Sequence, residues 1–257
     1  MKVAVINGSP RGKDGNTNIM VTAFLEGAQK AGAETVSIFL AEKEINHCKS
    51  CYHCVATGQC AINDDMDEVL SVTEGADVLV LATPLFFDNI SGMLKVYMDR
   101  RFALVDFRNM EKDDNGESRY VKPGASYTPF KSGFKPPKLM LISSCGYNER
   151  SQFKVISLWI KRLARNMISE VIGEIYATQG QFMNTQTELN QPFIAGYPQL
   201  IDNVAAYLQL VESVGKEVVC DKRLSETTNR KLMEQLFMPD ELAIRIRNSM
   251  FDCIPSK

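Results

Sequence analysis

The chain has 257 residues, of which 45% are hydrophobic and 23% are charged, so it is long enough to bury a substantial core. Its net charge of -2 gives no field that would attract nucleic acid or an anionic membrane surface, so we expect neither as a partner. No segment approaches about eighteen uninterrupted apolar residues, so we expect no membrane span or secretory signal and a cytoplasmic location.

Short apolar runs alternate with helical patterns along most of the chain. Residues 2–7 form a β-branched run that leads into a glycine-rich turn, and helical spacing follows from Thr17 to Gly32. Further strands are predicted at residues 35–40, 76–84, 138–146 and 171–180. Five strands that alternate with helices predict a doubly wound, mostly parallel α/β sheet.

Two segments do not fit this repeat. Residues 103–137 are rich in Gly, Pro, Asp and Asn, and they predict a long irregular insertion after the third helix. Beyond the last helix of the sheet domain, Ser225 and Pro239 predict the starts of two more helices. We therefore expect a domain over residues 1–216 and a C-terminal helical extension over residues 217–257.

The insertion and the extension also predict self-association. Both carry aromatic or aliphatic side chains that a monomer would expose, namely Phe107, Tyr120, Leu236 and Phe237. Since a compact five-stranded sheet needs neither segment, we expect a homodimer or homotetramer.

The loop after the first strand predicts a phosphate site. Residues 8–18 read GSPRGKDGNTN and lie between the carboxyl end of a strand and the start of a helix, where an open α/β sheet binds its ligand. Free N–H groups at a helix N-terminus, hydroxyls and an arginine suit a phosphate. The loop matches neither the Walker A pattern nor GxGxxG. The alternative is a turn that only caps the helix through Asn16 or Thr17.

Two other loops follow strands at the same edge of the predicted sheet. Residues 83–92 read TPLFFDNISG, and residues 144–147 read SCGY. Together with the phosphate loop, they suit a ligand with a phosphate at one end and a flat ring at the other. The alternative for Phe86 and Phe87 is that they are core aromatics.

The segments GSPR..GNT, TPLFFDNISGMLKVYMDR and SSCGYNE resemble the flavin-contacting segments of the flavodoxin-like NAD(P)H-dependent FMN reductases, in order and in spacing. The resemblance covers about residues 1–215 apart from the insertion, and it implies strand order 2-1-3-4-5 and non-covalent FMN. It implies that the phosphate is held by Ser9, Arg11, Asn16, Thr17 and Asn18, the isoalloxazine by Pro84, Leu85, Phe86, Phe87 and Asn89, and its far edge by Ser144, Cys145, Gly146 and Tyr147. The flavin carries the redox chemistry, with NAD(P)H as a candidate cosubstrate, so no catalytic side chain is required.

A second candidate site is a cysteine-rich loop after the second strand. It holds four of the chain's seven cysteines, Cys48, Cys51, Cys54 and Cys60. A close run of three cysteines with a fourth shortly after it is a ligand pattern of [4Fe-4S] clusters, and the spacing resembles that of iron-sulfur flavoproteins. The alternatives are zinc, with His47 or His53 as a further ligand, disulfides, and idle thiols.

These sites leave several functions open. The first is an FMN-dependent oxidoreductase or electron-transfer flavoprotein with a [4Fe-4S] cluster, whose partner is a small-molecule or protein electron donor or acceptor. The second is a plain NAD(P)H-dependent FMN or quinone reductase without a cluster. A flavodoxin-like binding module without a cofactor is the third.

Charged residues outside these loops predict no further site. The acidic run at residues 63–68 is interpreted as a helix cap, because acidic side chains offset the macrodipole there. We expect Lys95, Arg100 and Arg101 to lie on the solvated face of the third helix.

Overall fold

The computed structural model describes residues 1–57, 59–104, 110–112, 115–116, 118–120, 136–167 and 169–252. Most of the predicted insertion, including Phe107, lies outside these residues. The described part of the insertion contains two short antiparallel strands, β4 (Met110–Lys112) and β5 (Ser118–Tyr120).

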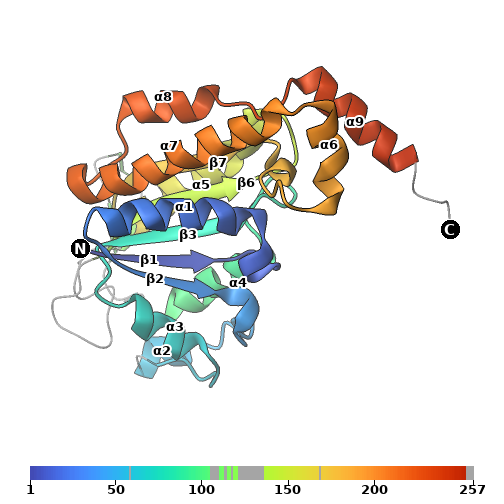
Figure 1. Cartoon of the computed structure of the whole chain (residues 1–257). Helices are drawn as coiled ribbons and strands as arrows, with labels where there is room; N and C mark the ends of the chain where they lie inside the picture. Colours follow the sequence, from blue (N-terminus) through green and yellow to red (C-terminus); the bar gives the residue numbers. More distant parts are fainter. Residues whose placement is uncertain are drawn as a thin grey trace.

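The centre of the molecule is a sheet of five parallel strands. They are β1 (Lys2–Asn7), β2 (Glu34–Phe39), β3 (Val78–Pro84), β6 (Lys138–Ser144) and β7 (Val171–Ala177). Their order is β2-β1-β3-β6-β7, which confirms the flavodoxin-like order 2-1-3-4-5. The inner strands are almost continuously buried because helices cover both faces of the sheet. All five strands point the same way, so the loops after them meet at one edge (Figure 1).

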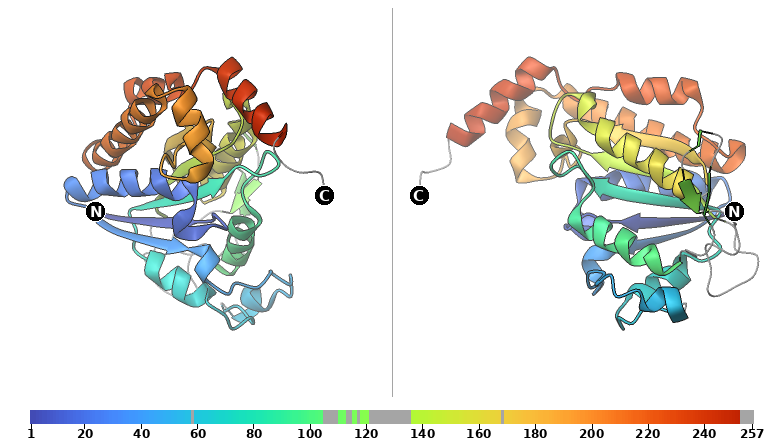
Figure 2. Two further views of the ribbon diagram at one scale, coloured as in Figure 1. Left: turned by 45° about the vertical axis from the view of Figure 1, so that its right-hand side comes forward. Right: turned by 180° about the vertical axis from the view of Figure 1, so that it is seen from behind.

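The helices form a layer on each face of the sheet (Figures 1 and 2). The longer ones on one face are α1 (Asn16–Lys30) and α7 (Gln199–Asp221). The other face is covered by α3 (Met66–Thr73), α4 (Gly92–Arg100) and α5 (Lys154–Asn166). Two short helices are α2 (His53–Thr57), inside the cysteine loop, and α6 (Gln191–Gly196), before α7. The three-layer arrangement follows from the two apolar faces of the sheet, each of which needs its own cover.

Helices α1 and α7 touch through two glycines. A Cβ atom added to Gly27 would lie 1.8 Å from the carbonyl oxygen of Glu212, and one added to Gly215 would lie 2.0 Å from that of Phe24. Both distances are far below a van der Waals contact, so the backbones can approach this closely only because neither residue has a side chain.

The C-terminal extension contains the two predicted helices, α8 (Glu226–Glu234) and α9 (Asp240–Asp252). Helix α7 runs past the expected boundary at residue 216, and the division into two domains stays a prediction. The side-chain amide of Gln179 binds the extension, because its Nε2 donates to the Met238 carbonyl at 2.9 Å and its Oε1 accepts from the Met238 N–H at 3.0 Å. Phe237 is only 2% exposed and packs against Tyr207, so the expectation that a monomer would expose it is wrong.

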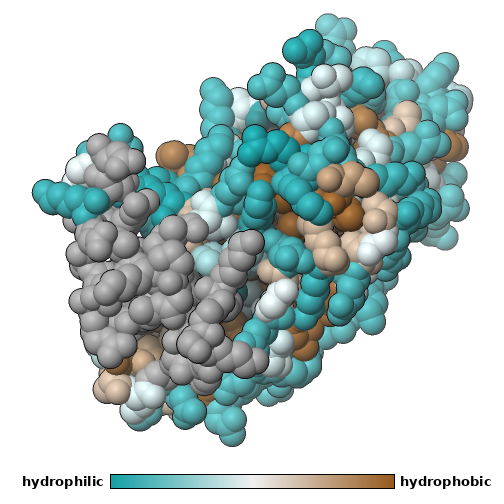
Figure 3. Space-filling view, turned by 90° about the vertical axis from the view of Figure 1, so that its left-hand side faces the viewer, coloured by the Kyte–Doolittle hydropathy of each residue, from teal (hydrophilic) through white to brown (hydrophobic). Residues whose placement is uncertain are grey.

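The surface at the amino ends of the strands is mostly hydrophilic where the structure describes it (Figure 3). Among the described helices, none has both the length and the apolar character needed to cross a membrane.

Candidate functional site

The loop after β1 folds tightly against the first turn of α1. The N–H of Ser9 donates to Oδ1 of Asn7 at 3.0 Å, and the Ser9 hydroxyl accepts from the N–H of Arg11 at 3.3 Å. Gly15 closes the loop, because a Cβ at this position would lie 2.4 Å from the Ser9 hydroxyl oxygen. The Arg11 side chain is exposed beside this turn, and the Asn18 amide donates to a loop carbonyl at 3.0 Å. The predicted phosphate residues therefore come together in one turn.

The N-terminus of α1 has no side-chain cap among the described residues. Gly15 occupies the N-cap position with an extended backbone, so the alternative of a cap by Asn16 or Thr17 is wrong. The first N–H groups of a helix have no partner within the helix, and they carry the positive end of its dipole. Such a terminus fits an anionic group such as a phosphate.

Hydrogen bonds join the three candidate loops at the carboxyl edge. The N–H of Gly8 donates to the carbonyl of Ala82 at 2.8 Å, and the Ser91 hydroxyl donates to the carbonyl of Gly8 at 2.6 Å. The N–H of Leu85 donates to the carbonyl of Ser144 at 2.9 Å. The loops after β1, β3 and β6 therefore form one continuous surface rather than three separate turns.

The loop after β3 contains a strained two-residue turn. Phe86 and Asn89 exchange backbone hydrogen bonds of 2.9 and 3.0 Å, and Phe87 and Asp88 between them have φ values of 47° and 58°. Positive φ at both positions is usual for Asn and Gly in hairpin turns and unfavourable for a phenylalanine. Phe86 is 47% exposed and Phe87 is fully exposed, so the alternative that they are core aromatics is wrong. A strained turn that holds an aromatic ring in solvent is typical of a ligand contact.

The other predicted ring contacts differ in exposure. Leu85, Ser144 and Cys145 are buried, whereas Tyr147 is 52% exposed. Pro84 is half-buried, and Asn89 and Gly146 are exposed. Burial raises the pKa of the Cys145 thiol to about 11, so this group is a neutral thiol at physiological pH.

Helix α9 also reaches the candidate flavin edge, which the sequence did not indicate. A cavity of about 120 Å³ is lined by Tyr147, Asn148, Glu149, Gln181, Ala243 and Ile244. The last two residues belong to α9, so the C-terminal extension forms one wall of a small pocket beside Tyr147. The helical pattern of this segment predicted the helix, but its position depends on long-range packing.

The four clustered cysteines all lie on the surface loop between β2 and α3. Cys48 and Cys51 are exposed, Cys54 and Cys60 are half-buried, and all four are free thiols. Partial burial raises the pKa of Cys54, and the other three cysteines raise it further. In the described part of the chain, however, no group of three or more His, Cys, Asp or Glu side chains is close enough to bind one metal ion. The donor set suits a soft-metal group, but the loop would have to close around it.

Two residues that flank Cys51 have left-handed backbones. Ser50 has a φ of 49° and Tyr52 has a φ of 56°. Neither residue is a glycine, so the local backbone is strained at the second of the four cysteines.

Three charged residues near this loop are placed differently from the prediction. Arg100 is 2% exposed and Arg101 is 8% exposed, so the expectation that both lie on a solvated face is wrong. Asp64 is an ion-pair partner of Arg100 rather than only a helix cap. Lys95 is the exception, because it forms an exposed pair with Asp99 at 2.6 Å.

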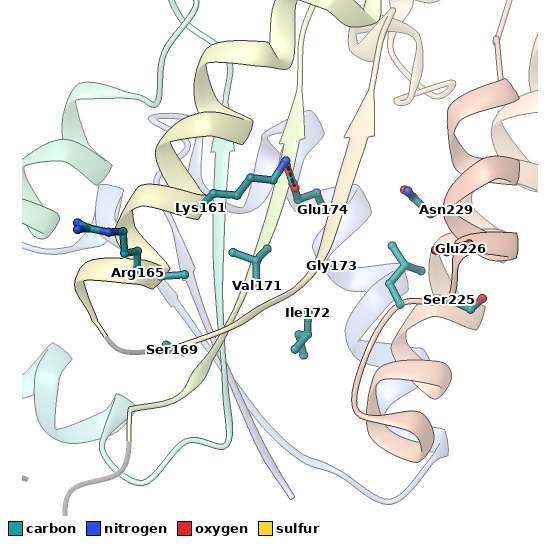
Figure 4. A pocket seen from close by; sticks show the side chains of 12 residues that line it. Lys161, Arg165, Ser169, Val171, Ile172, Gly173, Glu174, Ser225, Glu226 and Asn229 are labelled. Atoms are coloured by element: carbon teal, nitrogen blue, oxygen red, sulfur yellow. Dashed lines mark ion pairs between the residues drawn. The ribbon is translucent and has the colours of Figure 1, made fainter. Parts of the chain in front are cut away.

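A larger pocket lies away from the candidate site. It has a volume of about 500 Å³ and lies on the edge strand β7, between α5 and α8 (Figure 4). Lys161 and Arg165 extend from α5, and Lys161 pairs with Glu174 of β7 at 3.3 Å. Its strand residues lie in the amino half of β7, whereas the candidate loops follow the carboxyl ends of the strands.

Comparison with known proteins places the chain in a family. Residues 1–126 match the family described as NADPH-dependent FMN reductase. A protein of Archaeoglobus fulgidus named iron-sulfur flavoprotein is 38% identical over 182 residues, which are 71% of this chain and 78% of that protein. The chain belongs to the iron-sulfur flavoprotein branch of this family. This membership confirms the resemblance found in the sequence.

Other matches to iron-sulfur flavoproteins are shorter. One from Methanocaldococcus jannaschii is 44% identical over 100 residues, which are 39% of this chain and 51% of that protein. The chain thus spans about half the length of this relative. It also spans 45% of an iron-sulfur flavoprotein of Archaeoglobus fulgidus and 54% of one of Methanosarcina thermophila. The fold also resembles the solved structure of an FMN-dependent NADH-azoreductase of Bacillus anthracis in complex with FMN. The structural match has a TM-score of 0.51 and covers 90% of this chain and 99% of the azoreductase chain. At 16% identity, that likeness supports the fold.

Proposed function

We propose that this protein is an FMN-dependent oxidoreductase or electron-transfer flavoprotein that also carries a [4Fe-4S] cluster on the loop of Cys48 to Cys60. The observation that carries the flavin assignment is the uncapped N-terminus of α1, hydrogen-bonded into one surface with the loops after β3 and β6. When bound, FMN accepts hydride or single electrons and the cluster transfers single electrons.

In this proposal the chain's own residues bind and orient the flavin. The phosphate would be held by the N–H groups and side chains of Ser9, Arg11 and residues 16–18, because the first turn of α1 offers donors and a positive dipole end. The exposed rings of Phe86 and Phe87 would contact the isoalloxazine, and Tyr147 would lie at its far edge. No acid or base is required of the protein.

The cysteine loop would hold the cluster through four thiolates. Family membership and the chemistry of four free thiols on one loop support this assignment. We also propose a cytoplasmic location, because thiolate ligands need a compartment that keeps cysteines reduced.

A plain NAD(P)H-dependent FMN or quinone reductase is the second candidate. It is favoured by the open arrangement of the cysteines, because no ligand group for a metal ion has formed among the described residues. In that case NAD(P)H would be the electron donor, whereas a cluster would also accept electrons one at a time from a protein.

Anaerobic purification followed by flavin, iron, sulfide and zinc analysis separates the two candidates. We expect about one FMN with about four iron and four sulfide per chain. Replacing Cys51 with Ala should remove the iron and leave the FMN, and Cys220→Ala is the matched control because this exposed cysteine lies on α7. Full FMN without iron in the parent protein would establish the plain reductase, and zinc in place of iron would establish a structural metal site.

The phosphate site is tested by Asn16→Asp, an isosteric change at the first position of α1. A carboxylate there should stabilise the FMN-free protein by about 0.3–1 kcal/mol through the helix dipole, yet weaken FMN binding by repelling the phosphate. Gln29→Glu adds the same charge at the other end of α1 and should leave FMN affinity unchanged. Parent-like FMN affinity in Asn16→Asp would reject this phosphate site.

We further propose that the protein forms a homodimer or homotetramer. The exposed apolar side chains of the described monomer include Val155 (48%), Leu158 (64%) and Leu236 (46%). The first two lie one turn apart on α5, so they form a continuous apolar strip on its outer face.

A further inference from the structure

The last turn of α4 is joined to the cysteine loop by a buried ion pair. Nη1 of Arg100 lies 2.6 Å from Oδ2 of Asp64, and Nη2 lies 3.0 Å from Oδ1, so the pair is bidentate. The two side chains are 1% and 3% exposed. A bidentate pair of this kind fixes the orientation as well as the position of the guanidinium group.

The same pair closes the base of the loop. Arg100 also donates to the carbonyls of Asn46 at 2.9 Å and Ile62 at 3.4 Å, which lie just outside the first and last cysteines. The N–H of Asn46 donates to Oδ2 of Asp64 at 2.9 Å. The entry and the exit of the cysteine loop are therefore both fixed to one guanidinium group.

One N–H group of Arg100, at Nε, takes part in none of these hydrogen bonds. Its Nε is buried and has no hydrogen-bond partner among the described residues. Cys60 lies two residues before Ile62, whose carbonyl binds the same guanidinium group, so the last of the four cysteines is the one nearest to Arg100 along the chain.

A contact between Tyr52 and Phe102 joins the same two segments a second time. Their rings meet edge to face with centroids 6.2 Å apart. Tyr52 follows Cys51, and Phe102 lies two residues after Arg100. The α4 terminus therefore contacts both the middle and the base of the cysteine loop.

A contribution to stability does not by itself require an ion pair at this buried place. Replacement of such pairs by apolar side chains is often neutral or stabilising, because desolvation of both charges offsets their attraction. By contrast, a hydrogen bond and a positive charge at a ligand sulfur favour the reduced form of an iron-sulfur cluster.

We propose that Arg100 is a positioning and tuning residue for the fourth cysteine. Asp64 holds the guanidinium group in place, and the remaining Nε–H donates to the Cys60 sulfur when that sulfur binds iron. The donated hydrogen bond and the positive charge raise the reduction potential of the cluster. This inference rests on the proposed cluster.

The test compares cluster midpoint potentials, measured by redox titration followed by electron paramagnetic resonance, in the anaerobically purified protein. Arg100→Gln with Asp64→Asn replaces the ion pair by an amide pair of similar shape. We expect this double variant to keep its iron and FMN and to show a lower midpoint potential than the parent. Asp64→Asn alone keeps the Arg100 charge and should not lower the potential.

The matched control is Lys95→Gln with Asp99→Asn, which removes an exposed ion pair from the same helix and should leave the potential unchanged. If the double variant of the buried pair does not hold iron, Arg100→Lys keeps the charge but lacks the Nε donor, and a lower potential in this variant supports the proposal.

The outcomes are distinguishable. A parent-like potential in the double variant, or in Arg100→Lys where that variant is needed, overturns the proposal while the cluster assignment stands. If the midpoint potential decreases equally in the double variant and in Asp64→Asn, the ion pair only stabilises the conformation of the loop, and the tuning role is overturned. A parent protein that holds FMN but no iron overturns the cluster assignment and this inference with it.

Discussion

The hydroxyl groups of Thr17 and Ser144 lie 3.2 Å apart, although 127 positions separate the two residues in the chain. Thr17 is 1% exposed and Ser144 is 5% exposed. The contact joins the first turn of α1 to the end of β6, so it holds the loop after β1 against the loop that contains Cys145 and Tyr147.

Thr17→Val should test this contact, because it removes the hydroxyl and keeps the side-chain shape. The Ser144 hydroxyl would then be buried without its partner, so the free energy of unfolding should fall by about 1–3 kcal/mol. Ser144→Ala should have a similar effect, and the double variant should lose little more than either single one. Urea denaturation of the three variants measures this coupling, and strictly additive losses would show that the hydroxyls act independently.

Replacing Phe87 and Asp88 with Asn and Gly should separate stability from flavin binding. Asn-Gly suits positive φ at both turn positions, so the FMN-free variant should be more stable by about 1–3 kcal/mol. Loss of the exposed phenyl ring should nevertheless weaken FMN affinity in a fluorescence titration. Asp88→Gly alone relieves one strained position, keeps the ring, and should bind FMN as the parent does.

Acid should weaken the base of the cysteine loop as the pH falls from about 4 towards 2. Burial by itself raises the pKa of Asp64, but hydrogen bonds from Arg100, Asn46 and Met66 outweigh burial and lower it to about 2. A lowered pKa in the folded state stabilises the protein above about pH 4, and this stabilisation is lost as the pH falls from about 4 towards 2. The loss should amount to about 2 kcal/mol.

The measurement for this prediction is the free energy of unfolding of iron-free protein between pH 6 and 2. The control is Asp64→Asn with Arg100→Gln, in which neither position titrates over this range. Equal acid sensitivity of the parent and the double variant would contradict the assigned pKa of Asp64.

Cys145 should resist thiol reagents even though it lies at the candidate flavin edge. With a pKa of about 11, it has far less thiolate at pH 8 than an ordinary thiol and should react with iodoacetamide at least about a hundredfold more slowly. Its rate should rise steeply as the pH approaches 11. Peptide mapping against the exposed Cys220 provides the comparison, and similar rates at pH 8 would show that Cys145 is accessible and ionised.

Leu158→Glu should disrupt the proposed oligomer. The substitution places a charge in the apolar strip of α5, where Leu158 is 64% exposed, so it should not affect folding of the monomer. Light scattering should give a multiple of the 28.8 kDa chain mass for the parent and a lower multiple for the variant. Arg162→Glu changes the charge at another position of α5, so it tests whether any added negative charge on this helix lowers the mass. A parent protein with the mass of a single chain would contradict the proposed oligomer.

The sequence by itself determined the strands and the turn that leads from β1 into α1. Both depend on interactions between residues close in the chain: a buried parallel strand is an apolar run such as residues 2–7, and the turn after it must lead into a helix. The predicted strands agree with the structure to within three residues at every end, and the strand order followed from the resemblance of three loops.

The tertiary structure alone decided which charges and aromatic rings are buried. A charged residue on an amphipathic helix is usually solvated, and Arg100 is buried because Asp64, 36 positions away, folds back onto the end of α4. Phe237 is buried because α7 supplies Tyr207. Phe87 shows the opposite effect, since local preference disfavours its positive φ and only the hydrogen bonds around the turn maintain it. The burial of Arg100 and Phe237 depends on partners far away in the chain, whose approach no local pattern encodes.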